Sequence, residues 1–155
     1  MYFHPEETIR AFDKMGIRGF VSQPELDLIE GGNLEKSKEK VNDFIKIENP
    51  NENRIFKGIS CHSVHSSSDK FLKFYSNLAK EHNMYLHIHA CETQKEINDC
   101  KRVHKCSPIE YLNSFDLLTN KTILAHCVHV IADGNDLNLI KEKVCKIGKI
   151  LKKCP

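Results

Sequence analysis

His87–Thr93 (HIHACET) has the pattern of an apolar strand that ends in titratable side chains. Alternate residues of a strand share one face, so His87 and His89 point to the same side. Glu92 follows closely enough to fold back over a metal bound by His89. Taken alone, so short a motif more often marks a buried histidine bonded to a backbone carbonyl, with Glu92 capping the next helix. The neighbouring segments decide between these interpretations.

Two further predicted strands also end in histidine. His62 lies in CHSVH (residues 61–65), and His126 lies in AHCVH (residues 125–129). Ligands of parallel α/β folds bind at the carboxyl ends of the strands, so these three histidines are expected to share one site. Neutral imidazole is a good ligand for Zn²⁺ or Fe²⁺, and a nearby carboxylate can carry protons. For His126 alone, a ligand and a hydrogen-bonded core residue are equally good interpretations.

Helical and extended patterns alternate along the chain, which favours a parallel sheet with helical crossovers. No linker divides it, so residues 1–155 are expected to form one domain. The expected helices are 5–15 (ended by Gly16), 34–47, 68–81, 95–103, 108–112 and 136–144. The expected strands are 17–22, 54–60, 84–90 and 122–127, with a fifth at 146–151.

The composition is that of an ordinary soluble domain. Hydrophobic residues make up 40% and charged residues 28%, and the formal net charge is +2. This balance argues against nucleic acid or an acidic membrane surface as a partner. No apolar run approaches the ~20 residues that span a bilayer, and the N-terminus has no apolar signal core. We therefore expect a cytoplasmic protein without a membrane partner.

The seven cysteines form no CxxC pair and predict reduced thiols rather than a disulfide framework. Cys61, Cys91 and Cys127 lie beside the candidate site. A thiolate metal cluster is one interpretation, but their spacing fits no common zinc pattern. Small residues that fill the mouth of the site are the preferred interpretation.

Four segments in the correct order resemble the amidohydrolase superfamily. ISCHSVHSSSDKFL (59–72) resembles its strand-four segment, LHIHACETQKEI (86–97) its strand-five signature and ILAHCVHV (123–130) its strand-six signature. KCSPIEYL (105–112) resembles the stretch between strands five and six. The nearest group is that of the S-adenosylhomocysteine and methylthioadenosine deaminases, with the chlorohydrolases nearby. The resemblance covers roughly residues 1–136.

This resemblance implies a TIM (β/α)8 barrel that holds one divalent metal, zinc by preference with iron as the alternative. His89 and His126 match the metal ligands of strands five and six. Glu92 matches the catalytic, proton-carrying glutamate, which also contacts the substrate. His62 and Arg54 match substrate-binding positions.

The family also uses an HxH pair on its first strand and an aspartate on its eighth, and the sequence contains neither segment. A complete barrel needs ~250 residues. We therefore expect α/β architecture in the form of an incomplete barrel, about strands three to seven with outer helices, that is a fragment of a parent enzyme. Alone, the chain is expected to be inactive.

The implied function is metal-dependent hydrolytic deamination, by the parent enzyme, of an aminopurine nucleoside or related heterocycle. Such an enzyme is a C–N hydrolase of the cyclic amidine deaminase type. Its partner is a small-molecule substrate, and a homo-oligomeric parent enzyme is compatible with the resemblance. One alternative is another amidohydrolase, such as a guanine deaminase or a chlorohydrolase-like C–N or C–Cl hydrolase. The other is a truncated, non-catalytic metal-binding product.

Overall fold

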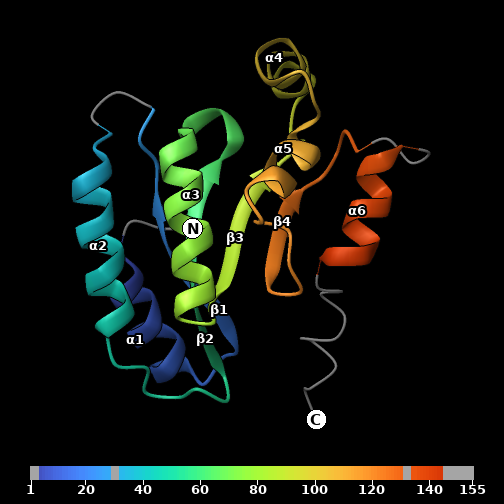
Figure 1. Cartoon of the computed structure of the whole chain (residues 1–155). Coiled ribbons are helices and arrows are strands. Elements are labelled where there is room, and N and C mark those ends of the chain that lie inside the picture. The colour runs from blue at the N-terminus through green and yellow to red at the C-terminus, as the bar shows by residue number, and fades with distance from the viewer. Residues whose placement is uncertain (1–3, 29–31, 131–133, 145–155) are drawn as a thin grey trace.

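A parallel sheet forms the centre of the computed structural model, which describes residues 4–28, 32–130 and 134–144. Its strands lie in sequence order, β1-β2-β3-β4, and each pairs in parallel with the next (Figure 1). Their bounds are Gly19–Glu25 (β1), Ile55–Ser63 (β2), Tyr85–Ala90 (β3) and Thr122–His126 (β4). In the described residues the sheet is open rather than closed into a ring.

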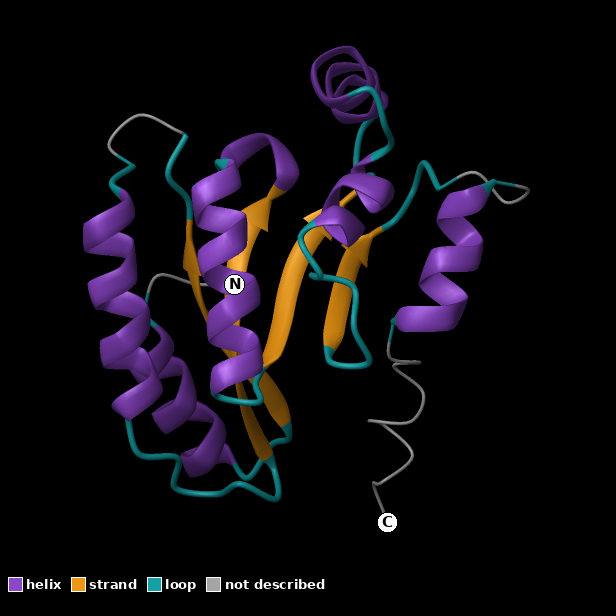
Figure 2. Ribbon diagram, viewed as in Figure 1, coloured by secondary structure: helices purple, strands orange, loops and turns teal. Residues whose placement is uncertain are grey.

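Helices connect the strands, and α2 packs against β1 while α3 packs against β2 and β3 (Figure 2). Their bounds are Pro5–Met15 (α1), Leu34–Lys46 (α2), Asp69–Glu81 (α3), Gln94–His104 (α4), Pro108–Ser114 (α5) and Asn135–Lys143 (α6). A short 3-10 turn, η1 (Val64–Ser66), follows β2. Among the described helices, none combines the length and hydrophobicity that crossing a bilayer requires.

The main core lies between the sheet and α3. Phe71, Leu72 and Tyr75 of α3 are fully buried, and they belong to one apolar cluster with Ile59 of β2 and Ile88 of β3. Full burial of such a side chain contributes roughly 1.5–3 kcal/mol. This core leaves the other face of β2 and β3 to the polar residues of the candidate site.

The element types are as expected from the sequence, and the differences lie at their ends. Gly16 ends α1 in the left-handed conformation, and Ser68 caps α3 by accepting a hydrogen bond from Phe71 N. The strand expected at 17–22 begins later, because Ile17 N bonds back to Phe12 O in the helix cap. It also continues through Pro24, which an edge strand tolerates. The strand expected at 146–151 lies outside the described residues.

Candidate functional site

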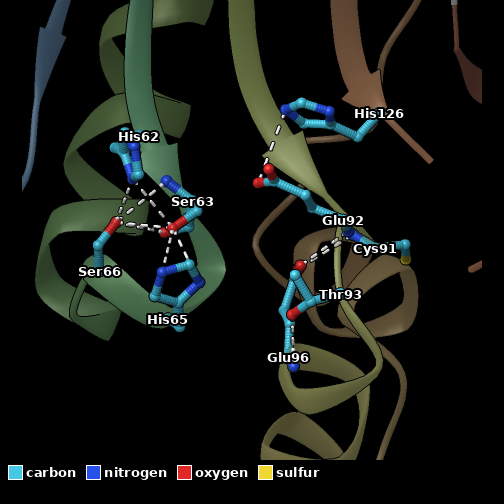
Figure 3. A network of polar contacts seen from close by, with 9 residues as sticks. All are labelled: His62, Ser63, His65, Ser66, Cys91, Glu92, Thr93, Glu96 and His126. Atoms are coloured by element: carbon cyan, nitrogen blue, oxygen red, sulfur yellow. Dashed lines mark hydrogen bonds and ion pairs between the residues drawn. The ribbon is translucent and has the colours of Figure 1, made fainter. Parts of the chain in front are cut away.

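His89, Glu92 and His126 converge at the carboxyl ends of β3 and β4. One potential ligand atom from each side chain lies within 4.8 Å of the others. The rings of His89 and His126 are 4.8 Å apart between centroids and nearly perpendicular. Glu92 Oε2 is 3.6 Å from His126 Nε2 (Figure 3). Two imidazoles and a carboxylate form a donor set that suits a divalent metal such as zinc.

His126 reaches this cluster through an unusual backbone conformation. In the register of β3 and β4, Ala125 lies beside His89, whereas His126 lies beside the buried Ala90. Strict alternation would therefore direct His126 to the face opposite His89. The φ angle of His126 is 69°, in the left-handed region that non-glycine residues seldom adopt. Alternation ends there, and its ring lies against His89.

Backbone hydrogen bonds join the loops that follow β3 and β4. Cys127 N donates to Ala90 O, and His129 N donates to Cys91 O, each at 3.0 Å. Cys91 and Cys127 also have positive φ angles, 54° and 53°. Residues in sparsely populated conformations persist where the surrounding structure holds them, and they cluster at functional sites. These cross-links keep the two histidine-bearing strand ends in register.

His62 lies next to the cluster on β2, with its ring centroid 5.2 Å from that of His89. Its Nδ1 is held by two serine hydroxyls, Ser66 Oγ at 3.1 Å and Ser63 Oγ at 3.2 Å (Figure 3). Ser63 Oγ in turn lies 3.1 Å from His65 Nδ1. Within the described part of the chain, Nε2 of His62 has no hydrogen-bond partner. That nitrogen is therefore free to contact a ligand.

The imidazoles of His62, His87 and His89 favour the neutral form. Burial, followed by the neighbouring His62 and His126, lowers the pKa of His89. Burial and His65 likewise lower the pKa of His62, although Glu92 acts in the opposite direction. The pKa of the more deeply buried His87 falls to about 4, chiefly through burial. Neutral imidazole is the form that binds a metal, so the environment favours coordination near neutral pH.

The cysteines beside the site are free thiols. Cys61 and Cys91 are fully buried, and burial raises the pKa of Cys61 to about 12. The pKa of Cys91 and of Cys127 is also raised, chiefly by burial. Protonated thiols bind metals poorly, because the thiolate is the ligand. The geometry supports the interpretation of small packing residues over that of a thiolate cluster.

Arg54, for which the resemblance implied a substrate-binding role, lies away from the cluster. It precedes the first residue of β2, so roughly 25 Å of strand separates it from His62. Its Nη2 is 2.9 Å from Asp13 Oδ1, and its Nη1 donates to Ile17 O. The guanidinium thus joins β2 to the end of α1, at the amino ends of the strands. The assignment of Arg54 to the substrate side stays a prediction, and in this structure its contacts are with α1 and the residues that follow it.

The ion pair between Arg54 and Asp13 allows a direct test of whether Arg54 stabilises the fold or binds substrate. We expect Arg54→Gln to lower the free energy of unfolding by about 1 kcal/mol or less, the usual value of a partly exposed ion pair. We expect KM for the substrate to stay the same. Asp13→Asn is the matched control, because it breaks the same ion pair. Urea unfolding and steady-state kinetics measure both quantities. A KM that rises tenfold for Arg54→Gln alone would assign Arg54 to the substrate site.

Sequence reasoning missed Glu96. It assigned the capping alternative to Glu92, whereas Glu96 is the carboxylate that accepts backbone N–H groups at the start of α4. Thr93 caps the helix by accepting from Glu96 N. The available signal was the spacing of a threonine N-cap and a glutamate three residues later, a known helix-start pattern.

The model of the amidohydrolase family matches the chain over residues 1–155. This chain belongs to the amidohydrolase family. The match covers all the segments that carry the resemblance, so the family expected from the sequence is confirmed. The histidine cluster lies where parallel strands of an α/β sheet end, the usual place for ligand sites in such folds.

Curated relatives from this family are nucleoside deaminases. The chain is 36% identical over 149 residues to the 5'-deoxyadenosine deaminase of Methanosphaera stadtmanae, covering 96% of this chain and 35% of the relative. It is 35% identical over 146 residues to the 5-methylthioadenosine/S-adenosylhomocysteine deaminase of Thermoanaerobacter pseudethanolicus, covering 92% of this chain and 33% of the relative. The chain therefore spans about a third of the length of these amidohydrolases.

Solved amidohydrolase structures share the fold. Guanine deaminase from C. acetobutylicum superposes with a TM-score of 0.79 at 24% identity, over 89% of this chain and 34% of that one. An adenosine deaminase from Xanthomonas campestris, solved with bound zinc, gives 0.78 at 18% identity, over 93% and 33%. The expected fold class is confirmed: four parallel strands with outer helices form part of a TIM-like barrel.

Proposed function

We propose that the protein containing this segment hydrolyses the exocyclic amino group of an adenosine-like nucleoside in a metal-dependent reaction. The cluster of His89, Glu92 and His126 supports this proposal, because it combines two imidazole donors with a carboxylate. The names of the curated relatives support the substrate class, which includes 5'-deoxyadenosine and 5-methylthioadenosine. The net reaction consumes one water, replaces the amino group with oxygen and releases ammonia.

His89 and His126 would hold the metal, with other ligands from outside these two side chains. A divalent metal supplies Lewis acidity that makes water a stronger nucleophile near neutral pH. Zinc suits an imidazole-rich donor set, and iron is the alternative. The donor atoms fit such an ion, because one atom of each of the three side chains lies within 4.8 Å of the others.

Glu92 is the proposed proton carrier. Its carboxylate is 43% exposed and reaches both His126 and the space in front of His89. From there it would take a proton from the attacking water and deliver it to the ring nitrogen. It would then pass the proton of the newly added hydroxyl to the departing amine as the carbonyl forms and the C–N bond breaks. Nδ1 of His62 is held by the two serine hydroxyls, which leaves Nε2, without a hydrogen-bond partner among the described residues, to form a hydrogen bond with the heterocycle.

His62 has a predicted effect on substrate affinity. We expect His62→Ala to raise KM by about tenfold, the value of one lost hydrogen bond, while the metal content stays the same. Ser67→Ala is the control, because Ser67 lies in the same segment, is buried, and has a hydroxyl with no hydrogen-bond partner among the described residues. Steady-state kinetics and elemental analysis measure the two effects. If His62→Ala emptied the metal site and spared KM, His62 would be a ligand instead.

The substrate class is tested with the protein at its full natural length. It is loaded with zinc or iron and assayed for ammonia release from 5'-deoxyadenosine, methylthioadenosine, S-adenosylhomocysteine, adenosine and guanine. A chlorotriazine is assayed for chloride release. Turnover confined to the adenosine-like nucleosides supports the proposal, whereas turnover of guanine or the chlorotriazine alone selects another amidohydrolase activity. If none reacts, the proposed deamination is contradicted, and metal retained in the same preparation supports a non-catalytic metal-binding product. The isolated 155-residue chain is expected to release no ammonia.

A further inference from the structure

The turn between β3 and α4 holds Glu92 in a constrained backbone. Cys91 precedes it with a φ angle of 54°, a conformation that non-glycine residues rarely adopt. Glu96, only 6% exposed, accepts a hydrogen bond from Cys91 N at 3.0 Å through Oε1 and from Glu92 N at 2.9 Å through Oε2 (Figure 3). Both oxygens of one carboxylate therefore bind the two peptide groups that set the direction of Glu92.

The placement of Glu96 on the helix explains why its carboxylate reaches this turn. Glu96 is the third residue of α4, and its own N–H donates to Oγ1 of the N-cap Thr93 at 3.1 Å. A carboxylate at this position is stabilised by the positive end of the helix dipole. Its hydrogen bonds go past the N-cap to the residues before it, unlike those of an ordinary capping box. A residue of the first turn of α4 thus holds the backbone of the preceding turn as well as that of the helix start.

We propose that Glu96 is a positioning residue, whose carboxylate holds the Cys91–Glu92 turn so that the Glu92 side chain faces His89 and His126. This inference rests on the proposed function only for its effect on turnover. The physical reason lies in the acceptor count: a carboxylate offers an acceptor to each N–H, whereas an amide offers one oxygen and one NH₂ group. In Glu96→Gln, the side-chain NH₂ group would face one of the two backbone N–H groups. Both are donors, so that N–H would lose its hydrogen bond.

Glu110 provides a matched control in the next helix. It is also the third residue of its helix, α5, and its carboxylate accepts from the N-cap Ser107 N at 3.0 Å. The second carboxylate oxygen accepts from Asn135 Nδ2, away from the cluster. Glu110→Gln therefore makes the same chemical change at the same helix position without contact with the Glu92 turn.

The first measurement needs no substrate. We expect the Cys91 and Glu92 amides to exchange with deuterium about tenfold faster in Glu96→Gln and at the wild-type rate in Glu110→Gln. Unchanged exchange in Glu96→Gln would overturn the proposal. If Glu96→Gln does not fold, Glu96→Asp keeps the charge on a shorter side chain that fails to reach both amides, and the same acceleration is expected.

The second measurement separates positioning from general stability. We expect Glu96→Gln to lower kcat by ~10–10²-fold at unchanged metal content and nearly unchanged KM, the scale of a misplaced catalytic group. Because Glu96 acts through Glu92, the double variant Glu92→Gln/Glu96→Gln should have the kcat of Glu92→Gln alone. A multiplicative loss in the double variant, or an equal loss in Glu110→Gln, would refute the positioning role. Failure of the wild type on every nucleoside would refute the proposed function instead, and amide exchange would still decide the role of Glu96.

Discussion

Glu92→Gln is expected to lower kcat by ~10²-fold or more while the metal stays bound, because the amide keeps the shape of the side chain but loses its proton-carrying ability. Glu92 lies 3.6 Å from His126 Nε2 and is partly exposed, so it contacts both the ligand cluster and the space that a substrate would occupy. Single-turnover ammonia release and elemental analysis of the same preparation give the two quantities.

The metal content decides between two roles for Glu92. Its carboxylate is near enough to His89 and His126 to be a ligand itself. A Glu92→Gln protein that retains its metal and loses turnover behaves as a proton-carrier variant. An empty site in the same variant would assign Glu92 to the metal ligands and contradict the prediction. Glu81→Gln, at the end of α3, is a control for the loss of one carboxylate.

His126→Ala is expected to weaken metal binding by ~10²-fold or more and to reduce turnover to background. Removing a group that only hydrogen-bonds a metal ligand already lowers metal affinity by ~10–100-fold. Removing the ligand itself is expected to lower the affinity by at least as much. Competition with a chromogenic chelator measures the affinity. His89→Ala should have the same effect, because the two rings meet at 4.8 Å.

His129 provides the control for this experiment. It lies in the same loop as His126, and its contact with Cys91 is made by the backbone N–H, which alanine keeps. We expect His129→Ala to bind metal with the wild-type affinity. If His126→Ala and His129→Ala lost equal affinity, the loop as a whole rather than the His126 imidazole would hold the ion.

The sheet and part of the site followed from strand alternation. His87 and His89 share the face that lies away from the main core, as the period of two requires, while Ile88 and Ala90 are buried on the other face. His62 follows the same rule on β2. The four strands and their helices were identified because apolar runs and turn residues alternate with amphipathic segments.

Three features of the structure show where such rules stop. The convergence of His126 depends on a left-handed backbone that alternation does not contain. The register shift between Ser60 and Ser63 extends β2 beyond the end predicted for it. Arg54 was assigned by its position in a motif, and such a motif does not contain the ion pair that its guanidinium forms with Asp13. Local electrostatics and backbone strain depend on tertiary neighbours that a linear pattern leaves out.

The order β1-β2-β3-β4 has a consequence for biosynthesis. Within the described residues, β2, β3 and β4 each pair with the strand made just before, so these pairings need no segment from later in the chain. Synthesis proceeds at ~5–20 residues per second, and the stretch from His89 to His126 is therefore completed within several seconds. His62, His89, Glu92 and His126 leave the ribosome in the order in which their strands join the sheet. The corner of the sheet that carries these four side chains is thus suited to assemble in chain order, while the ribosome is still translating.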